Sequence, residues 1–250
     1  MKKLMMMAAS LTWATGVFAD GISSAEIVGY HKQDLVSGKL NMGGISFLPC
    51  DAGKTTFNLN TDLAFENLTP GEGNGDGDEI RVWNPRTSGY TTFFYYNDGE
   101  EAGWYGMMDE EPELEAGTAF WYLSPVKTAA PKSTVVSGTV EMESSVTDVI
   151  TGGKLNMLIS AYPDKIDLND TASIEFANLT PGEGNGDGDE IRVWNPKTSG
   201  YTTFFYYNDG EEAGWYGMMD EEPVLAANTA FWFLAQKGDG KTVTYKNQTK

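Results

Sequence analysis

Alternating apolar and polar positions, separated by turn residues, predict that this chain is built from β-strands. Glu79–Trp83 alternates apolar and polar side chains, and Tyr90–Tyr96 is β-branched or aromatic throughout. Between them, Asn84–Gly89 has the Asn, Pro, Ser and Gly residues of a turn. The same order recurs at 190–234, and beyond the N-terminal segment no long helical periodicity stands out. We therefore expect an all-β protein.

An internal repeat organises the chain. Residues 67–123 and 178–234 align without a gap and differ at five positions, and weaker similarity continues upstream. At one of these positions Gly117 stands against Asn228. Gly and Asn best tolerate a left-handed backbone, so both are expected to have φ > 0. Each copy is long enough for its own core, which predicts two tandem antiparallel β-sandwich or small-barrel units.

The N-terminal segment and the middle of the chain set the expected domain boundaries. Lys2 and Lys3, a short apolar run and the small-residue end Val17-Phe18-Ala19 are typical of a secretory signal peptide. The Pro-containing stretch 124–137 has the composition of a linker. The expected organisation is a signal peptide at 1–19, a first β unit at 20–123, a linker at 124–137 and a second β unit at 138–250. We expect the protein to be exported, to the periplasm, the cell surface or the extracellular space.

The aromatic strings carry a family resemblance. Ile80-x-Val-Trp-Asn-Pro-x-Thr-x-Gly-Tyr-Thr-Thr-Phe-Phe-Tyr-Tyr is followed by Gly-Trp-Tyr at 103–105 and Ala-Gly-Thr-Ala-Phe-Trp-Tyr at 116–122. This order resembles a repeat found in exported proteins of Planctomycetes–Verrucomicrobia–Lentisphaerae-type bacteria. With Ile27–Tyr30 and Leu40–Met42, the resemblance covers most of the chain after the signal. It implies an exported β-rich module and brings no catalytic residues with it.

The net charge of the chain indicates which kinds of partner to expect. With 36 acidic and 17 basic residues, the formal net charge is −19, which repels phosphate backbones and argues against nucleic acid. No stretch after the signal is apolar enough to span a bilayer. The expected partners are a glycan, an envelope protein or further copies of the chain. Cys50 is the single cysteine; an intermolecular bridge is one interpretation, and a buried apolar thiol is the one we favour.

A Gly-rich acidic loop suggests one binding chemistry. In 70–79 and 181–190, oxygen-bearing side chains alternate with Gly, a pattern that suits a hard cation such as Ca²⁺. A helix-flanked calcium loop would end on a bidentate Glu, and Trp83 stands at that position. Two interpretations stay open, a β-type calcium site and a solvated acidic turn. The predicted ligands are Glu72, Asn74, Asp76, Asp78, Glu183, Asn185, Asp187 and Asp189.

The aromatic residues suggest a second binding chemistry. Glycan sites stack sugar rings on flat aromatic faces, while the competing interpretation places these rings in a sheet core. The candidate ligand-binding rings are Trp83, Trp104, Trp194 and Trp215. The strand at 90–96 has large side chains on both faces, Tyr90, Phe94 and Tyr96 on one, and Phe93 and Tyr95 on the other. Either this strand is covered on both sides, or some of its rings are exposed for binding.

The sequence offers little for catalysis. His31 is the only histidine, and neither it nor Cys50 has a counterpart in the second copy, so His- or Cys-based catalysis and metal binding are not expected. Paired carboxylates for glycoside hydrolysis stay open, with candidates Glu79, Glu100, Glu101 and Asp109. We predict a non-catalytic structural or binding module of the cell envelope or surface. A carbohydrate-binding protein is the first alternative, and a carboxylate glycosidase is the second.

Overall fold

In the computed structural model, which describes residues 27–51, 53–108 and 110–248, the chain folds into antiparallel β-sheets. These residues form twenty strands and no helix, so the predicted all-β class is confirmed. None of the described segments is therefore a helix that could cross a bilayer. The predicted signal peptide at 1–19 lies outside the described residues.

Ten strands build the first half of the molecule. They are β1 (Val28–Leu35), β2 (Leu40–Gly44), β3 (Thr56–Asn58), β4 (Leu63–Glu66), β5 (Glu79–Asn84), β6 (Gly89–Asn97), β7 (Ala102–Gly106), β8 (Glu113–Glu115), β9 (Ala119–Leu123) and β10 (Lys132–Thr139). A five-stranded sheet has the order β2-β9-β5-β6-β7, a three-stranded sheet has the order β1-β10-β4, and β3 pairs with β8.

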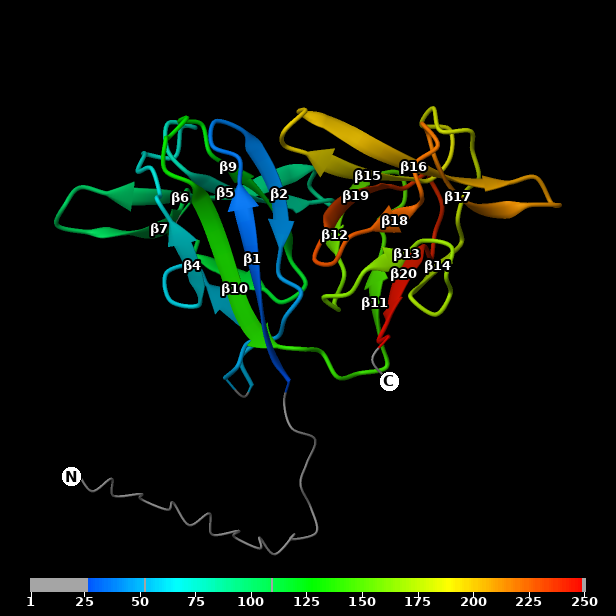
Figure 1. The fold of residues 1–250 in the computed structure, drawn as a ribbon, viewed down its shortest axis with the longest axis horizontal. Coiled ribbons are helices and arrows are strands. Elements are labelled where there is room, and N and C mark those ends of the chain that lie inside the picture. The colour runs from blue at the N-terminus through cyan, green and yellow to red at the C-terminus, as the bar shows by residue number, and fades with distance from the viewer. Residues whose placement is uncertain (1–26, 52, 109, 249–250) are drawn as a thin grey trace, which may run out of the picture.

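The second half repeats this arrangement strand for strand. Its strands are β11 (Ser145–Val149), β12 (Leu155–Ile159), β13 (Ile166–Asp167), β14 (Ile174–Ala177), β15 (Glu190–Asn195), β16 (Gly200–Asn208), β17 (Ala213–Gly217), β18 (Val224–Leu225), β19 (Ala230–Leu234) and β20 (Thr242–Lys246). The sheet orders are β12-β19-β15-β16-β17, β11-β20-β14 and β13-β18. Figure 1 shows the two halves side by side, with the β6–β7 and β16–β17 hairpins at opposite ends.

The boundary between the halves differs from the predicted one. The stretch 124–137, predicted to be a linker, contains most of β10, which pairs with β1 on one side and β4 on the other. β10 completes the first three-stranded sheet as β20 completes the second. Pro131 suggested a linker, but a proline just before a strand removes no ladder hydrogen bond. The connection between the halves is 140–144.

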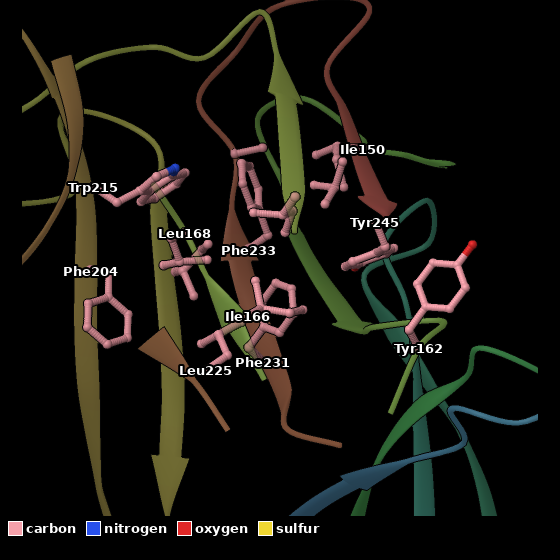
Figure 2. Close-up of a cluster of buried hydrophobic side chains, with 14 residues drawn as sticks. Ile150, Tyr162, Ile166, Leu168, Phe204, Trp215, Leu225, Phe231, Phe233 and Tyr245 are labelled. Carbon is pink, nitrogen blue, oxygen red and sulfur yellow. The ribbon is translucent and has the colours of Figure 1, made fainter. Parts of the chain in front are cut away.

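Each half buries its own apolar core between its sheets. In the second half, Phe204, Trp215 and Phe233 come from the five-stranded sheet and face Tyr245 of the three-stranded sheet (Figure 2). The first half has a matching core. The turn before the last strand of each large sheet is also as predicted, because Gly117 has φ 79° and Asn228 has φ 57°.

Candidate functional site

The acidic loop between β4 and β5 is held closed by hydrogen bonds within the loop and to β6. Gly71 N donates to the Tyr95 carbonyl oxygen at 2.9 Å, and Glu72 N donates to Asp76 Oδ1 at 3.0 Å. The hydrogen bond from Glu72 N holds the pKa of Asp76 below its usual range. A Cβ on Gly71 or Gly77 would clash with the backbone of the other glycine. The glycines therefore allow a close backbone approach, and the loop is a packed element.

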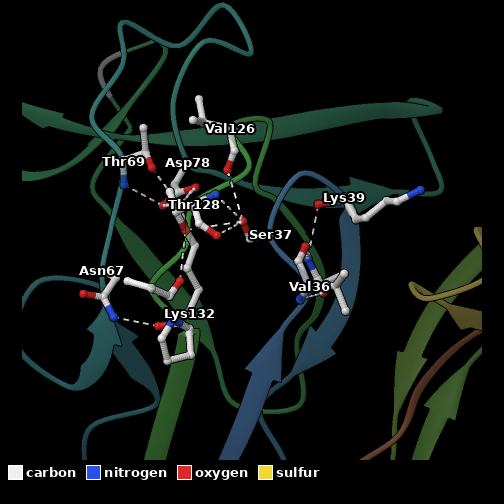
Figure 3. Close-up of polar contacts among 12 residues, drawn as sticks. Val36, Ser37, Lys39, Asn67, Thr69, Asp78, Val126, Thr128 and Lys132 are labelled. Carbon is white, nitrogen blue, oxygen red and sulfur yellow. Dashed lines mark hydrogen bonds and ion pairs between the residues drawn. The ribbon is translucent and has the colours of Figure 1, made fainter.

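Asp78, predicted as a calcium ligand, is paired inside the protein. Both of its carboxylate oxygens accept hydrogen bonds from Lys132 Nζ at 2.7 Å, and both side chains are buried (Figure 3). Oδ2 also accepts a hydrogen bond from Thr69 N at 2.8 Å. Asp189 Oδ2 accepts a hydrogen bond from the buried Lys241 Nζ at 2.6 Å, and Asp189 Oδ1 accepts one from Gln236 N at 2.7 Å. The prediction that these two aspartates bind calcium is wrong, because each carboxylate is buried and its oxygens already accept hydrogen bonds from a buried lysine and from backbone N–H groups.

The other predicted calcium ligands are exposed on the two acidic loops. Glu72 and Asn74 are exposed, and so are Glu183 and Asn185 in the second loop. Asp76 and Asp187 accept backbone hydrogen bonds within their own loops. Across the described ranges, no three acidic, histidine or cysteine side chains form a group that could hold a metal ion.

Trp104 and Trp215 lie in the cores. Each is 2% exposed, and each packs against a phenylalanine of the facing sheet, Phe65 or Phe176, at a ring-centroid distance of 4.9 Å. The Asn60 side chain bonds both the N–H and the carbonyl of Trp104, which caps the outer edge of β7 at this residue. The prediction that these two rings stack on a sugar is wrong, since the core covers them.

Trp83 and Trp194 lie between the two halves. Trp83 Nε1 donates to the Leu155 carbonyl oxygen at 2.7 Å, and Trp194 Nε1 donates to the Leu40 carbonyl oxygen at 2.8 Å. Each indole also meets a tryptophan of the other half edge-on, with Trp83–Trp232 and Trp121–Trp194 centroids 5.7 and 5.6 Å apart. These two rings therefore join the halves, and the surface role predicted for them is not what their contacts show.

The contact between the halves is apolar and reciprocal. Its buried side chains are Met42, Ala119, Trp121, Ile159, Ala230 and Trp232. At its margin, Lys39 Nζ donates to Ser199 Oγ and Lys154 Nζ donates to Ser88 Oγ, both at 2.9 Å. Matching residues thus exchange matching contacts, as across a two-fold symmetric interface.

An open hollow lies on the outer part of the first five-stranded sheet. We call it the first hollow; it has a volume of about 410 Å³ and is lined by Glu72, Phe94, Tyr96, Glu101, Tyr105 and Gly106. Phe94 and Tyr96 project from one face of β6, while Phe93 and Tyr95 belong to the core on its other face. Of the two interpretations of this strand, partial exposure of one aromatic face is the one observed.

The two tyrosine rings of the first hollow stand at right angles to each other. Tyr96 and Tyr105 have an interplanar angle of 87° and a centroid distance of 6.1 Å, and Phe94 lies 6.2 Å from Tyr105. The Tyr96 hydroxyl donates to Asp98 Oδ2 at 3.1 Å. A hydrogen bond to Glu101 raises the pKa of Tyr105, as the bond to Asp98 raises that of Tyr96. Both phenols therefore stay protonated at neutral pH beside carboxylates.

The second half carries an equivalent hollow. The second hollow has a volume of about 390 Å³ and is lined by Glu183, Phe205, Tyr207, Glu212, Tyr216, Gly217 and Asp220. Tyr207 and Tyr216 have an interplanar angle of 89°, and Tyr216 Oη donates to Glu212 Oε1 at 2.8 Å. The ligand-binding residues predicted from the sequence were tryptophans; Tyr105, Tyr207 and Tyr216 were not among them, and Tyr96 was named only as a ring on one face of its strand. The signal that could have found them was the aromatic strand with large side chains on both faces.

The backbone of the acidic loop sets one wall of each hollow. A Cβ on Gly73 would come within 3.0 Å of the Phe94 ring, and a Cβ on Gly184 would come within 2.9 Å of the Phe205 ring. This close approach is possible only because glycine stands there, with φ of 81° and 86°. It places Glu72 at the rim of the first hollow.

The described carboxylates among the predicted glycosidase candidates lie in two different environments. Glu79 is buried and bonds Arg81 at 2.6 Å, whereas Glu100 and Glu101 lie exposed at the tip of the β6–β7 hairpin. Asp109 lies outside the described residues. A cavity between the halves has a volume of about 120 Å³, below the roughly 300–1,000 Å³ of ligand pockets. Cys50 is exposed, so the prediction of a buried thiol is wrong.

Comparison with known proteins gives no relative. Neither a scan against protein-family models nor searches of curated proteins and of solved structures found a match to this chain. The chemistry of the two hollows is what bears on function.

Proposed function

We propose that this chain is a non-catalytic binding module of the cell envelope or surface, with one ligand site in each half. The supporting observation is that the same aromatic and carboxylate side chains line an open hollow in both halves. Exposed rings beside hydrogen-bonding groups bind ligands that have both an apolar face and a polar edge. The N-terminal signal pattern supports a place outside the cytoplasm.

The composition of the hollows favours binding over catalysis. Their lining residues include no hydroxyl–histidine or thiol–histidine pair that could serve as nucleophile and base. Glu101, the hollow carboxylate among the glycosidase candidates, accepts a hydrogen bond from Tyr105. Each hollow is open to solvent, whereas enzymes that cleave stable bonds usually close around the reacting atoms. An open aromatic wall is suited to holding a segment of a larger molecule.

A paired array experiment tests the proposal. Labelled full-length protein is applied to a glycan array and to a peptide array, together with the variant Tyr105→Ala/Tyr216→Ala. The variant should lose the signal on each ligand that the unchanged protein binds. Tyr30→Ala is the matched control, because Tyr30 is 77% exposed and lies on β1 outside both hollows. Equal binding by the double variant, or no ligand on either array, would overturn the proposal.

A further inference from the structure

We propose that each hollow receives the cationic side chain of a lysine or arginine from a basic polypeptide. This inference rests on the proposed binding function and names its ligand class. It draws on three features of the hollows, namely their charge, the arrangement of their rings and the methionines beside them.

The first hollow is negatively charged and contains no compensating cation. Glu72 and Glu101 line it, and Asp98 is bonded to one of its tyrosines, while its lining includes no Lys or Arg. Within the described part of the chain, none of these three carboxylates takes part in an ion pair. The whole chain has a net charge of −19, so the long-range field also draws cations toward the surface.

The ring geometry suits a cation. Two tyrosines at right angles form a corner, and a cation within about 6 Å of a ring centroid is attracted by the negative charge of the ring face. The hydroxyls of Tyr96, Tyr207 and Tyr216 each donate to a carboxylate, which polarises the phenol and makes its ring richer in electrons. A neutral sugar could stack on these rings, but it would gain nothing from the charge of the carboxylates.

The surroundings of each hollow favour a polypeptide over a small ammonium compound. Met107 lies against the loop that walls the first hollow, and its neighbour Met108 is 82% exposed. Met218 and Met219 repeat this arrangement in the second half. Exposed methionines adapt to varied apolar contacts and are common on surfaces that bind peptides. A small ion would leave these methionines uncovered, whereas the residues next to a bound lysine would pack against them.

The test measures binding of a fluorescent lysine–glycine repeat peptide to the full chain, with a glutamine–glycine peptide and neutral oligosaccharides as comparison probes. Binding of the lysine peptide should weaken at least about tenfold in Tyr105→Ala/Tyr216→Ala, since both cation–π walls are broken. A charge variant keeps the rings but removes four hollow carboxylates. Its substitutions are Glu72→Gln, Glu101→Gln, Glu183→Gln and Glu212→Gln, and it should weaken binding to a similar extent.

A charge-matched control separates the hollows from the general field. It changes four exposed acids outside both hollows, Asp51→Asn, Glu115→Gln, Glu143→Gln and Asp239→Asn, and should bind like the unchanged protein. An equal loss in this control would overturn the inference, because binding would then follow net charge alone. Ring-dependent binding of a neutral oligosaccharide in place of the lysine peptide would overturn the cationic ligand and leave the binding function standing. No ring-dependent binding of any probe would overturn both.

Discussion

Asp148 is a carboxylate half-buried between the two halves of the molecule. It lies on β11, lines the cavity there together with Glu141, and is close to the Tyr245 hydroxyl. Burial raises its pKa above the usual range. The matching position on β1 is Gln33, since Gln33 lies opposite Thr134 as Asp148 lies opposite Val243. A neutral amide is thus already present at this place in the first half.

Replacing this carboxylate should stabilise the protein in a pH-dependent way. A raised pKa in the folded state favours folding below the unfolded pKa of about 3.9, and that contribution is lost as the pH rises through the folded value. At about pH 7 the charged, half-buried group therefore costs stability. We expect Asp148→Asn to raise the melting temperature at about pH 7 and to make no difference near pH 3. A gain of the same size at both pH values would contradict the burial of charge as its cause.

Backbone conformation at single residues was predictable from the sequence. The exchange of Gly117 for Asn228 indicated a left-handed turn, and both residues have positive φ. Which carboxylates are buried in ion pairs and which stay exposed was not predictable. Asp78 and Asp76 are two residues apart in one loop, yet Asp78 is paired with Lys132, 54 residues away, while Asp76 stays exposed. A local pattern of carboxylates does not show which of them a distant lysine will neutralise.

At the scale of elements, the buried ion pair fixes the start of the last strand in each half. Lys132 is the first residue of β10 and forms a buried ion pair with Asp78 at the end of the acidic loop. Lys241, just before β20, forms the equivalent ion pair with Asp189. Removing one partner leaves the other charge buried and alone, which typically costs about 3–5 kcal/mol. We expect Lys132→Met and Lys241→Met each to lower the unfolding free energy by about this amount, as measured by urea denaturation.

An exposed ion pair on the same sheet provides the control for this prediction. Lys32 and Glu66 lie 3.3 Å apart, and their side chains are 47% and 54% exposed. Such pairs contribute at most about 1 kcal/mol, so Lys32→Met should have a small effect. If Lys132→Met costs no more than this control, the buried pair does not anchor the strand.

The strands with regular patterns were predictable, and those in an unusual context were not. The predicted runs 79–83 and 90–96 correspond to β5 and β6. β10 was predicted as a linker because its first half follows two prolines and has few large apolar side chains. Its pairing with β1 and β4 depends on strands more than 60 residues earlier in the chain, which local composition cannot report.

At the scale of the whole molecule, the roles of the aromatic residues follow from the contact between the halves. Each indole hydrogen bond across this contact joins residues far apart in sequence, Trp83 with Leu155 and Trp194 with Leu40. Sequence alone therefore could not separate the tryptophans that join the halves from rings on the free surface. Among the described residues, the tyrosines of the hollows take no part in the aromatic contacts between the halves, and they are the rings that the proposed ligand would meet.

The two hollows point to a divalent molecule. The halves meet through β2, β9, β12 and β19, whereas β7 and β17 are the outermost strands of the large sheets. The hairpins that carry the hollows accordingly lie at opposite ends of the molecule (Figure 1). A short ligand cannot occupy both hollows at once, so we expect the protein to bridge two ligand molecules or two distant segments of one polymer.

The most direct test of this account is the number of binding sites in each chain. Calorimetric titration with the lysine–glycine peptide should give two equivalent sites for the unchanged protein, one for Tyr105→Ala, one for Tyr216→Ala and none for the double variant. A single site in the unchanged protein, or an unchanged number of sites in both single variants, would contradict the assignment of one ligand site to each hollow.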